Sequence, residues 1–363
     1  MRLPYYLLAG ILAVGSVTVP GTSASAAPVD ARSTAQASPA HEALHGLFKA
    51  EWDFMMAQDP LWASVLGDYR FNDRWRDLSS TARQARARHY RDTLERLRSL
   101  DRNRLDAADQ LNYDLFEREV AMLVEHSALG AERMPLSHRD GIHAAHDIAD
   151  FLRFETVKDY EDWIARMRAF PTYMDQTLAL MQEGKAAGLM PPKAIMSRIP
   201  AQLALQLPES PEASPFYKPF TKMAAGIPAA EQERLRRQAG AAIRESVIPA
   251  YRKFEQVFTR EYLPASPEKV GLSHLPGGKQ LYAYYARYYT TTDMSPSRIH
   301  QLGLSEVTRI RREMEAIMAE VGFKGSLSEF FAHMKRQKQY FRADADALLM
   351  EYRALSRRID PLL

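Results

Sequence analysis

From about residue 41 onward, apolar residues recur every three or four positions, the period of a helix with one buried face. The first such segment runs from His41 to Gln58. Further segments with this period follow through the rest of the chain, separated by proline, glycine or short polar stretches. We find no convincing run of alternating residues with hairpin turns. The pattern predicts an all-α fold, a large array of about a dozen helices without an internal repeat.

Capping residues and prolines indicate several helix boundaries. Residues 156–159 and 326–329 have the spacing of a capping box, in which the first side chain and the fourth each bond the other's backbone N–H. Pro249 is expected to kink a long helix over residues 229–262, because proline removes an internal hydrogen bond. Residues 208–228 contain several prolines and aromatic residues, and we expect them to form a loop over the surface.

The N-terminus has the form of a signal peptide. A short positive start precedes an apolar run over residues 3–19, and the small residues 24–26 suit signal peptidase. The apolar run is shorter than the roughly 20 residues that a spanning helix needs, although an uncleaved anchor is the alternative. We therefore expect a signal peptide over 1–26, a disordered tail over 27–40 and a helical domain over 41–363. The expected location is periplasmic or secreted, with no integral membrane segment after cleavage.

Composition excludes several classes of function. The chain has 48 Lys and Arg against 45 Asp and Glu, so charge gives no argument for binding nucleic acid or an anionic membrane. Its basic residues are scattered along helices, which is typical of solvated faces. The chain has no cysteine, which rules out a cysteine nucleophile, a thiolate metal site and a lipid-modified cysteine. We find no phosphate-binding glycine loop and no Gly-x-Ser-x-Gly elbow.

The segment 271–323 is the most distinctive part of the chain. Gly277 and Gly278 form a tight turn that allows positive φ and a close approach of backbone. Tyrosines then recur at helical spacing on one face, namely Tyr282, Tyr285 and Tyr289. In a cleft wall their hydroxyls would bind a peptide carbonyl or an oxyanion, whereas in a core they would pack with paired hydroxyls. Our candidate substrate-binding residues are Gly277, Gly278, Tyr282 and Tyr285.

Several motifs in this segment and elsewhere resemble those of the bacterial secreted proteins grouped as domain of unknown function 885. Within the segment these are Gly271-Leu272, Leu275-Pro276-Gly277-Gly278, Tyr282, Ser295-Pro296, Ile299-His300, Leu302-Gly303, Arg309 to Met314 and Gly322-Phe323. Elsewhere they are Pro60 to Gly67, Thr156 to Tyr160, Ile164-Ala165-Arg166 and Pro249-Ala250-Tyr251. The family is similar to helical zinc metallopeptidases of the gluzincin type.

This resemblance implies a hydrolase that acts on a peptide substrate. Zinc-activated water would attack the peptide bond, with a glutamate as general base. In the family the histidine–glutamate zinc box lies beyond the part that this chain matches, and the apolar end at Leu363 suggests a continuing polypeptide. The resemblance thus implies that the chain is the N-terminal, substrate-channel portion of a zinc peptidase, inactive alone and without zinc of its own. Its catalytic residues stay unknown. The alternative is a non-catalytic periplasmic binding or chaperone-like helical protein.

Two histidine pairs are minor candidates for metal ligands. His41 and His45 flank Glu42 in the bare His-Glu-x-x-His pattern, but they lie at the start of the helical region, where the family has no such box. A position at the surface or the rim is the alternative.

The second pair, His143 and His146, would lie near one face of a helical turn. Asp147 or His138 could complete a site there. The alternative is a set of solvated side chains at a helix start.

Overall fold

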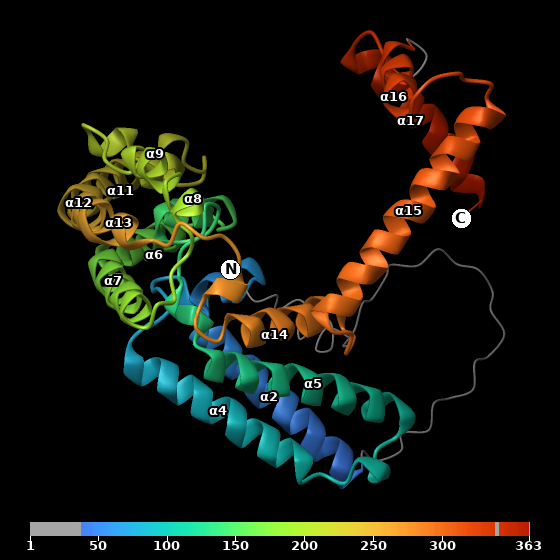
Figure 1. Cartoon of the computed structure of the whole chain (residues 1–363). Helices are drawn as coiled ribbons and strands as arrows, with labels where there is room; N and C mark the ends of the chain where they lie inside the picture. The colour runs from blue at the N-terminus through green and yellow to red at the C-terminus, as the bar shows by residue number, and fades with distance from the viewer. Residues whose placement is uncertain (1–37, 338–340, 363) are drawn as a thin grey trace, which may run out of the picture. The chain divides into compact units, whose positions relative to one another are not determined.

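The structure is a computed structural model that describes residues 38–337 and 341–362. The predicted signal peptide and all but the end of the predicted tail lie outside the described residues. Helices and turns make up the described ranges, which contain no strand, so the prediction of an all-α fold is confirmed (Figure 1). The chain divides into two compact units, the first ending at Tyr288 and the second beginning at Tyr289.

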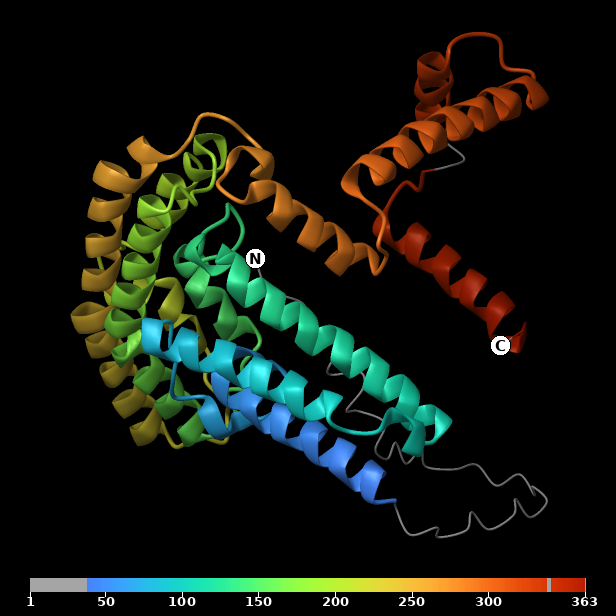
Figure 2. The ribbon, with the colours of Figure 1, turned by 60° about the horizontal axis from the view of Figure 1, so that its bottom comes forward.

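The first unit begins with a group of long helices that lie side by side (Figure 2). They are α2 (Pro39–Gln58), α4 (Ser80–Arg98) and α5 (Ala107–Leu129), with the short α3 (Pro60–Val65) following α2. Leu44, Leu97 and Phe116 are fully buried between the long helices. Each helix contributes residues from one face, as the helical period predicts.

A second group of helices surrounds the largest apolar cluster. It contains α6 (Val157–Arg168), α7 (Phe170–Ala186), α8 (Lys193–Met196), α9 (Ile199–Ala204), α10 (Lys218–Thr221), α11 (Ala229–Ala242), α12 (Ile248–Val257) and α13 (Leu263–Ala265). Residues 208–228 are part of this cluster, since Phe216 and Phe220 are fully buried. The prediction of a surface loop there is wrong, because the prolines begin short helices that carry aromatic side chains inward.

Local sequence signals set several boundaries as expected. Both capping boxes form, with Thr156 before α6 and Ser326 before α16. The disturbance expected at Pro249 is a π-helical turn over Ile243–Val247, one turn before the proline. A second π-helical turn, Phe258–Tyr262, precedes Pro264 in the same way.

The remaining helices are α14 (Gly278–Thr290), α15 (Pro296–Glu320), α16 (Leu327–Arg336) and α17 (Ala345–Ile359). The second unit buries little, since Met318 is the buried apolar side chain among its described residues. In the described part of the chain, no helix is long and apolar enough to cross a membrane.

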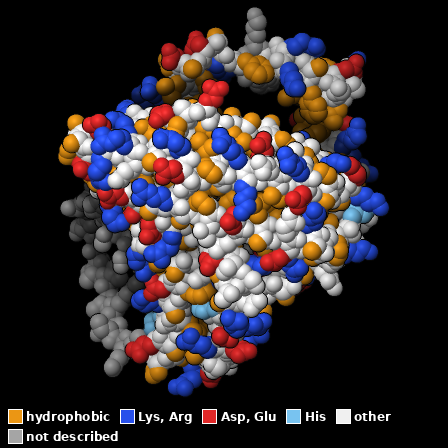
Figure 3. Space-filling view, turned by 90° about the vertical axis from the view of Figure 1, so that its left-hand side faces the viewer, with side chains coloured by type: hydrophobic (Ala, Val, Ile, Leu, Met, Phe, Trp, Pro, Cys, Tyr) orange, Lys and Arg blue, Asp and Glu red, His pale blue; other side chains and the backbone are white. Residues whose placement is uncertain are grey.

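Charged side chains of both signs are interspersed on the face of the molecule shown in Figure 3. They do not gather into a patch of one sign on that face, in keeping with the near balance of acids and bases in the sequence.

Candidate functional site

A cavity of about 360 Å³ lies inside the first unit, where its apolar clusters meet. Residues of α3, α4, α5, α7 and α14 supply its wall, together with the segment between α5 and α6. Its volume lies at the lower end of the range for small-molecule pockets. The cavity is the candidate functional site because it brings aromatic and charged side chains from distant parts of the chain together.

Two tryptophans form part of the apolar wall. Trp62 comes from α3 and Trp75 from the segment between α3 and α4. The ring of Trp75 stacks on Tyr173 of α7, with ring centroids 4.9 Å apart and ring planes inclined by 5°. Its indole N–H donates a hydrogen bond of 2.7 Å to the backbone carbonyl of Arg166, which fixes the ring orientation.

Arg166 supports this wall from behind. Its side chain is fully buried, and its guanidinium lies 5.7 Å from the centre of the Trp75 ring. It donates hydrogen bonds to the Phe71 carbonyl at 3.1 Å and to the Ser64 hydroxyl at 3.4 Å. Burial lowers the pKa of Arg166 to about 10, so the group still carries its charge at neutral pH. The attraction between this cation and the ring helps to hold Trp75 in place.

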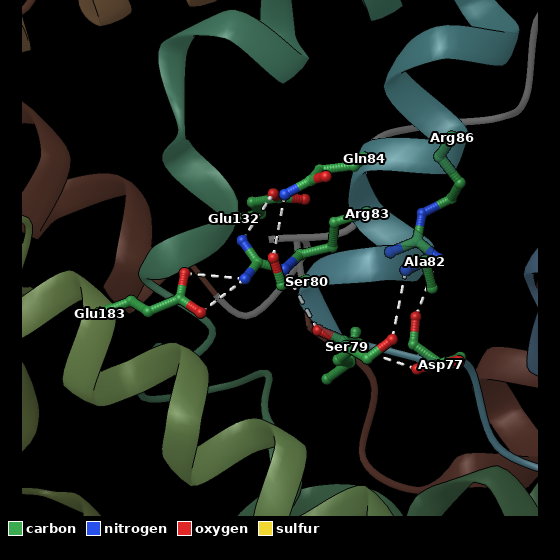
Figure 4. A network of polar contacts seen from close by, with 10 residues as sticks. Asp77, Ser79, Ser80, Ala82, Arg83, Gln84, Arg86, Glu132 and Glu183 are labelled. Carbon is green, nitrogen blue, oxygen red and sulfur yellow. Dashed lines mark hydrogen bonds and ion pairs between the residues drawn. The ribbon is translucent and has the colours of Figure 1, made fainter.

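Arg83 and Arg86 of α4 form the centre of a polar network beside the cavity (Figure 4). One nitrogen of Arg83 donates to both carboxylate oxygens of Glu183 at 2.7 Å, and another donates to Glu132 at 3.2 Å. Arg86 donates to the backbone carbonyl of Asp77 at 2.8 Å. Burial opposes the charge of Arg83, but its two carboxylate partners outweigh that effect and raise its pKa.

These two arginines were not found by sequence analysis. The basic residues of this helix were expected on a solvated face, which is wrong for Arg83 and Arg86, whose exposed fractions are 11% and 4%. A signal was nevertheless present. Their spacing places them on the same face as the apolar residues Tyr90, Leu94 and Leu97, which are buried.

His126 and Tyr285 contribute the polar part of the wall between α5 and α14. The centre of the His126 ring lies 5.6 Å from the ring of Tyr284 and 6.4 Å from that of Tyr285. Burial lowers the pKa of His126, so its imidazole is neutral at pH 7. A neutral imidazole can donate one hydrogen bond and accept another.

The structure separates the predicted substrate-binding tyrosines. Tyr285 lines the cavity, whereas Tyr282 and Tyr289 are exposed, with exposed fractions of 52% and 55%. These three do share one face, but the tyrosines packed in the core are Tyr284 and Tyr288. The role of the three in substrate binding stays a prediction.

The two glycines form the turn before α14. Gly277 has a φ of +65°, the left-handed region that glycine favours. Gly278 is buried, and a Cβ added there would lie 1.6 Å from the backbone oxygen of Leu272. Both therefore have a structural reason to be glycine, and neither is among the residues that line the cavity.

The structure treats the two histidine pairs differently. His41 and His45 both contact Asp109 of α5, and these three form the one group of possible metal ligands found among the described residues. His143 is 2% exposed, which overturns the alternative of a solvated side chain there. His146 instead contacts Gln206 at 3.0 Å and Asp147 at 3.1 Å.

Comparison with known proteins places the fold. No curated protein matches the chain. The fold is similar to that of "the putative lipoprotein from Colwellia psychrerythraea", a crystal structure with a TM-score of 0.74 and 18% identity. The match covers 90% of this chain but 59% of that one, so this chain spans less than two thirds of its length. A family model described as "Bacterial protein of unknown function (DUF885)" matches residues 60–363, and the chain therefore belongs to this family.

Proposed function

We propose that the chain is the substrate-binding portion of an exported zinc-dependent peptidase. The cavity of the first unit carries this proposal, because its wall combines aromatic side chains with a few fixed polar groups. Tyr285, which the sequence singled out as substrate-facing, is part of that wall. Export is supported by the signal-peptide pattern over residues 1–26.

The lining predicts what the cavity would bind. Trp62 offers apolar surface suited to an apolar or aromatic side chain of a peptide, and Trp75, held by Tyr173 and Arg166, borders it. The neutral imidazole of His126 and the hydroxyl of Tyr285 would bond the peptide backbone beside that side chain. Arg83 is already committed to two carboxylates, so it serves to hold the wall rather than to capture an acidic substrate.

The cavity does not itself fit a catalytic zinc. The one group of three possible ligands in the described part of the chain is His41, His45 and Asp109, and none of these lines the cavity. We therefore assign no hydrolytic step to these residues. In this proposal the catalytic zinc is held by a further part of the peptidase, as the family resemblance implies, and the chain alone hydrolyses nothing.

A binding test uses the two cavity tryptophans as reporters. Titration with a blocked tripeptide of phenylalanine and leucine is expected to change tryptophan fluorescence with saturation. Ala87 lines the cavity from α4, so Ala87→Phe should fill it and weaken binding by about tenfold or more. Ala85 is exposed on the same helix, and Ala85→Phe should bind like the unaltered chain. A response that does not saturate, or equal binding by both variants, would contradict the proposal.

Hydrolysis separates the proposal from its alternative, a non-catalytic helical binding protein. The absence of a three-ligand group from the described lining favours that alternative for the chain taken alone. The protein purified from its native host is expected to cleave peptides in a chelator-sensitive way if the proposal holds. Peptide binding without any cleavage by that protein would favour the binding protein.

A further inference from the structure

Three side chains with metal-binding chemistry converge at the start of α2 and α5. The Nδ1 atom of His41 lies 2.6 Å from one carboxylate oxygen of Asp109, and Nε2 of His45 lies 2.9 Å from the other. All three ligand atoms lie within 4.8 Å of one another. We propose that His41, His45 and Asp109 bind one divalent transition-metal ion of the zinc class, independently of the cavity.

The local sequence explains why the histidines point the same way. They are four residues apart in α2, so they lie on the same face of the helix. Their rings stack with centroids 4.0 Å apart. Leu44 and Phe48 are buried on the inner side of α2, and the ring centroids of Phe48 and His45 lie 5.3 Å apart in a T-shaped arrangement. The apolar packing of α2 therefore fixes the direction in which both imidazoles project.

Asp109 is held in place by its own helix. It lies in the first turn of α5, where its backbone N–H donates to the side chain of Asp106 at 2.8 Å. Its side chain is 7% exposed, and its ion pairs in the described structure are with the two histidines. The site therefore contains a buried carboxylate whose ion pairs, within the described ranges, involve neither lysine nor arginine.

The geometry requires little change to accept an ion. Zinc binds imidazole nitrogen and carboxylate oxygen at about 2.0–2.2 Å, which places neighbouring ligand atoms of a tetrahedron about 3.3 Å apart. The present contacts of 2.6 and 2.9 Å would open by about half an ångström. Each imidazole would bind the ion through the nitrogen that now faces Asp109, with its proton on the other ring nitrogen. Two imidazoles and one carboxylate are a ligand set that zinc accepts, with water completing the coordination.

The competing interpretation is a pair of ordinary histidine–carboxylate contacts. The positive ends of the two helix dipoles also oppose a cation at this place. The chain contains a control for that interpretation, namely His89, whose Nε2 lies 2.7 Å from Glu51 without belonging to a three-ligand group. What distinguishes the proposed site is the third ligand, Asp109, which joins both histidines from another helix. The exposed fractions of His41 and His45, 40% and 45%, leave the site accessible to an ion from solvent.

Isothermal titration with zinc chloride tests the site on the tag-free 363-residue chain after removal of metal by dialysis against chelator. One saturable site per chain is expected. His45→Ala and Asp109→Asn should each weaken it by at least about tenfold, because each removes a ligand. His89→Ala should bind as tightly as the unaltered chain. Absence of a saturable site would overturn the proposal. So would zinc binding by His45→Ala and Asp109→Asn that is as tight as binding by the unaltered chain.

A second measurement guards against variants that fail to fold. Zinc should raise the thermal midpoint of the unaltered chain and of His89→Ala, because an ion that binds the folded state stabilises it. At the same zinc concentration it should raise the midpoint of Asp109→Asn by less, while circular dichroism shows the same helicity. A zinc-dependent rise of the thermal midpoint in Asp109→Asn equal to that of the unaltered chain would contradict the proposal. Peptide binding in the cavity is read by tryptophan fluorescence, so the two proposals fail separately.

Discussion

At Gly278 there is no room for a methyl group. At Gly277 there is room, but the backbone has a positive φ that alanine adopts only at a cost. A Cβ at Gly278 would lie 1.6 Å from the oxygen of Leu272, and this oxygen belongs to backbone that cannot rotate away. At Gly277 the nearest atom would be 3.8 Å away, so the cost there is the positive φ alone. A third glycine, Gly46, lies within α2, and a Cβ added there would have no neighbouring atom within 4 Å. Identical substitutions should therefore have different effects.

The three alanine substitutions are expected to fall in a fixed order. Gly278→Ala should destabilise the first unit by about 2–4 kcal/mol, since backbone must shift. Gly277→Ala should cost about 1–2 kcal/mol through the left-handed backbone. Gly46→Ala should stabilise by about 0.5–1 kcal/mol, because alanine is the better helix former. Urea unfolding followed by circular dichroism measures all three, and a mild effect of Gly278→Ala would contradict the tight approach.

Acid should destabilise the protein partly through His143. Burial lowers its pKa to about 4, and neither ring nitrogen has a hydrogen-bond partner in the described structure. An unfolded histidine has a pKa of about 6.5. Between pH 6.5 and 4 the unfolded chain thus binds a proton that the folded chain does not, so stability falls as the pH falls.

His143→Leu should remove this contribution. Between pH 7.5 and 5, its free energy of unfolding should fall by about 2 kcal/mol less than that of the unaltered chain. Both proteins contain the same carboxylates, so comparing their slopes removes the contribution of carboxylate titration to the pH dependence. His274 is exposed, so His274→Leu is the matched control and should keep the original slope. Equal slopes for all three proteins would show that His143 is not buried as a neutral group.

At the scale of elements, buried charge joins helices that the apolar pattern alone would not connect. Arg83 extends from α4 to Glu183 of α7 and to Glu132 in the turn after α5. Its 11% exposure means that water replaces these contacts poorly. The carboxylates are more exposed, at 43% for Glu183 and 36% for Glu132, which limits the strength of each pair. The network therefore positions the cavity wall more than it stabilises the fold.

A double-mutant cycle measures the connection between α4 and α7. Arg83→Met is expected to cost about 1–3 kcal/mol, since Glu183 and Glu132 lose a bonded partner. With Glu183→Gln, the coupling energy should be about 0.5–1 kcal/mol, reduced by the exposure of Glu183. Arg88→Met, at an exposed position of α4, should have almost no effect. A coupling energy near zero would show that the bidentate contact does not join the helices.

At the scale of the whole molecule, the two units differ in how much they bury. The first unit contains all three apolar clusters, with many side chains fully inaccessible. The second carries apolar residues along its helices that stay exposed, among them Val307, Ile317 and Leu349. Because burial of apolar surface supplies most of the stability of a helix in a protein, the second unit has little to hold it.

Hydrogen exchange should report this difference directly. Backbone amides of α15, α16 and α17 are expected to exchange at least about tenfold faster than those of α6, α7 and α12, because little apolar packing must be broken to open them. Mass spectrometry of peptic fragments gives the comparison within one sample. Both groups are helices, so a difference in exchange between them cannot come from helix formation itself. Equal protection in the two units would mean that the exposed faces are covered in solution.

Much of the fold followed from local signals. The helical period and the capping boxes at Thr156 and Ser326 depend only on neighbouring residues, so the all-α class and these helix boundaries were correctly predicted. The burial of Phe216 and Phe220 was missed, because whether a proline-rich stretch lies over a surface or inside it depends on distant helices. Arg83 and Arg86 were missed although their helical spacing places them on the buried face of α4, because basic residues were expected on solvated faces.

The sequence by itself determined the elements, the tight turn at Gly277 and Gly278 and the four-residue spacing of His41 and His45. Only the tertiary structure decided that Asp109, far along the chain, meets both histidines, and that Tyr285 rather than Tyr282 lines a cavity. Helical periods fix which side chains share a face. They leave open which faces meet, because that choice depends on packing between segments remote in sequence.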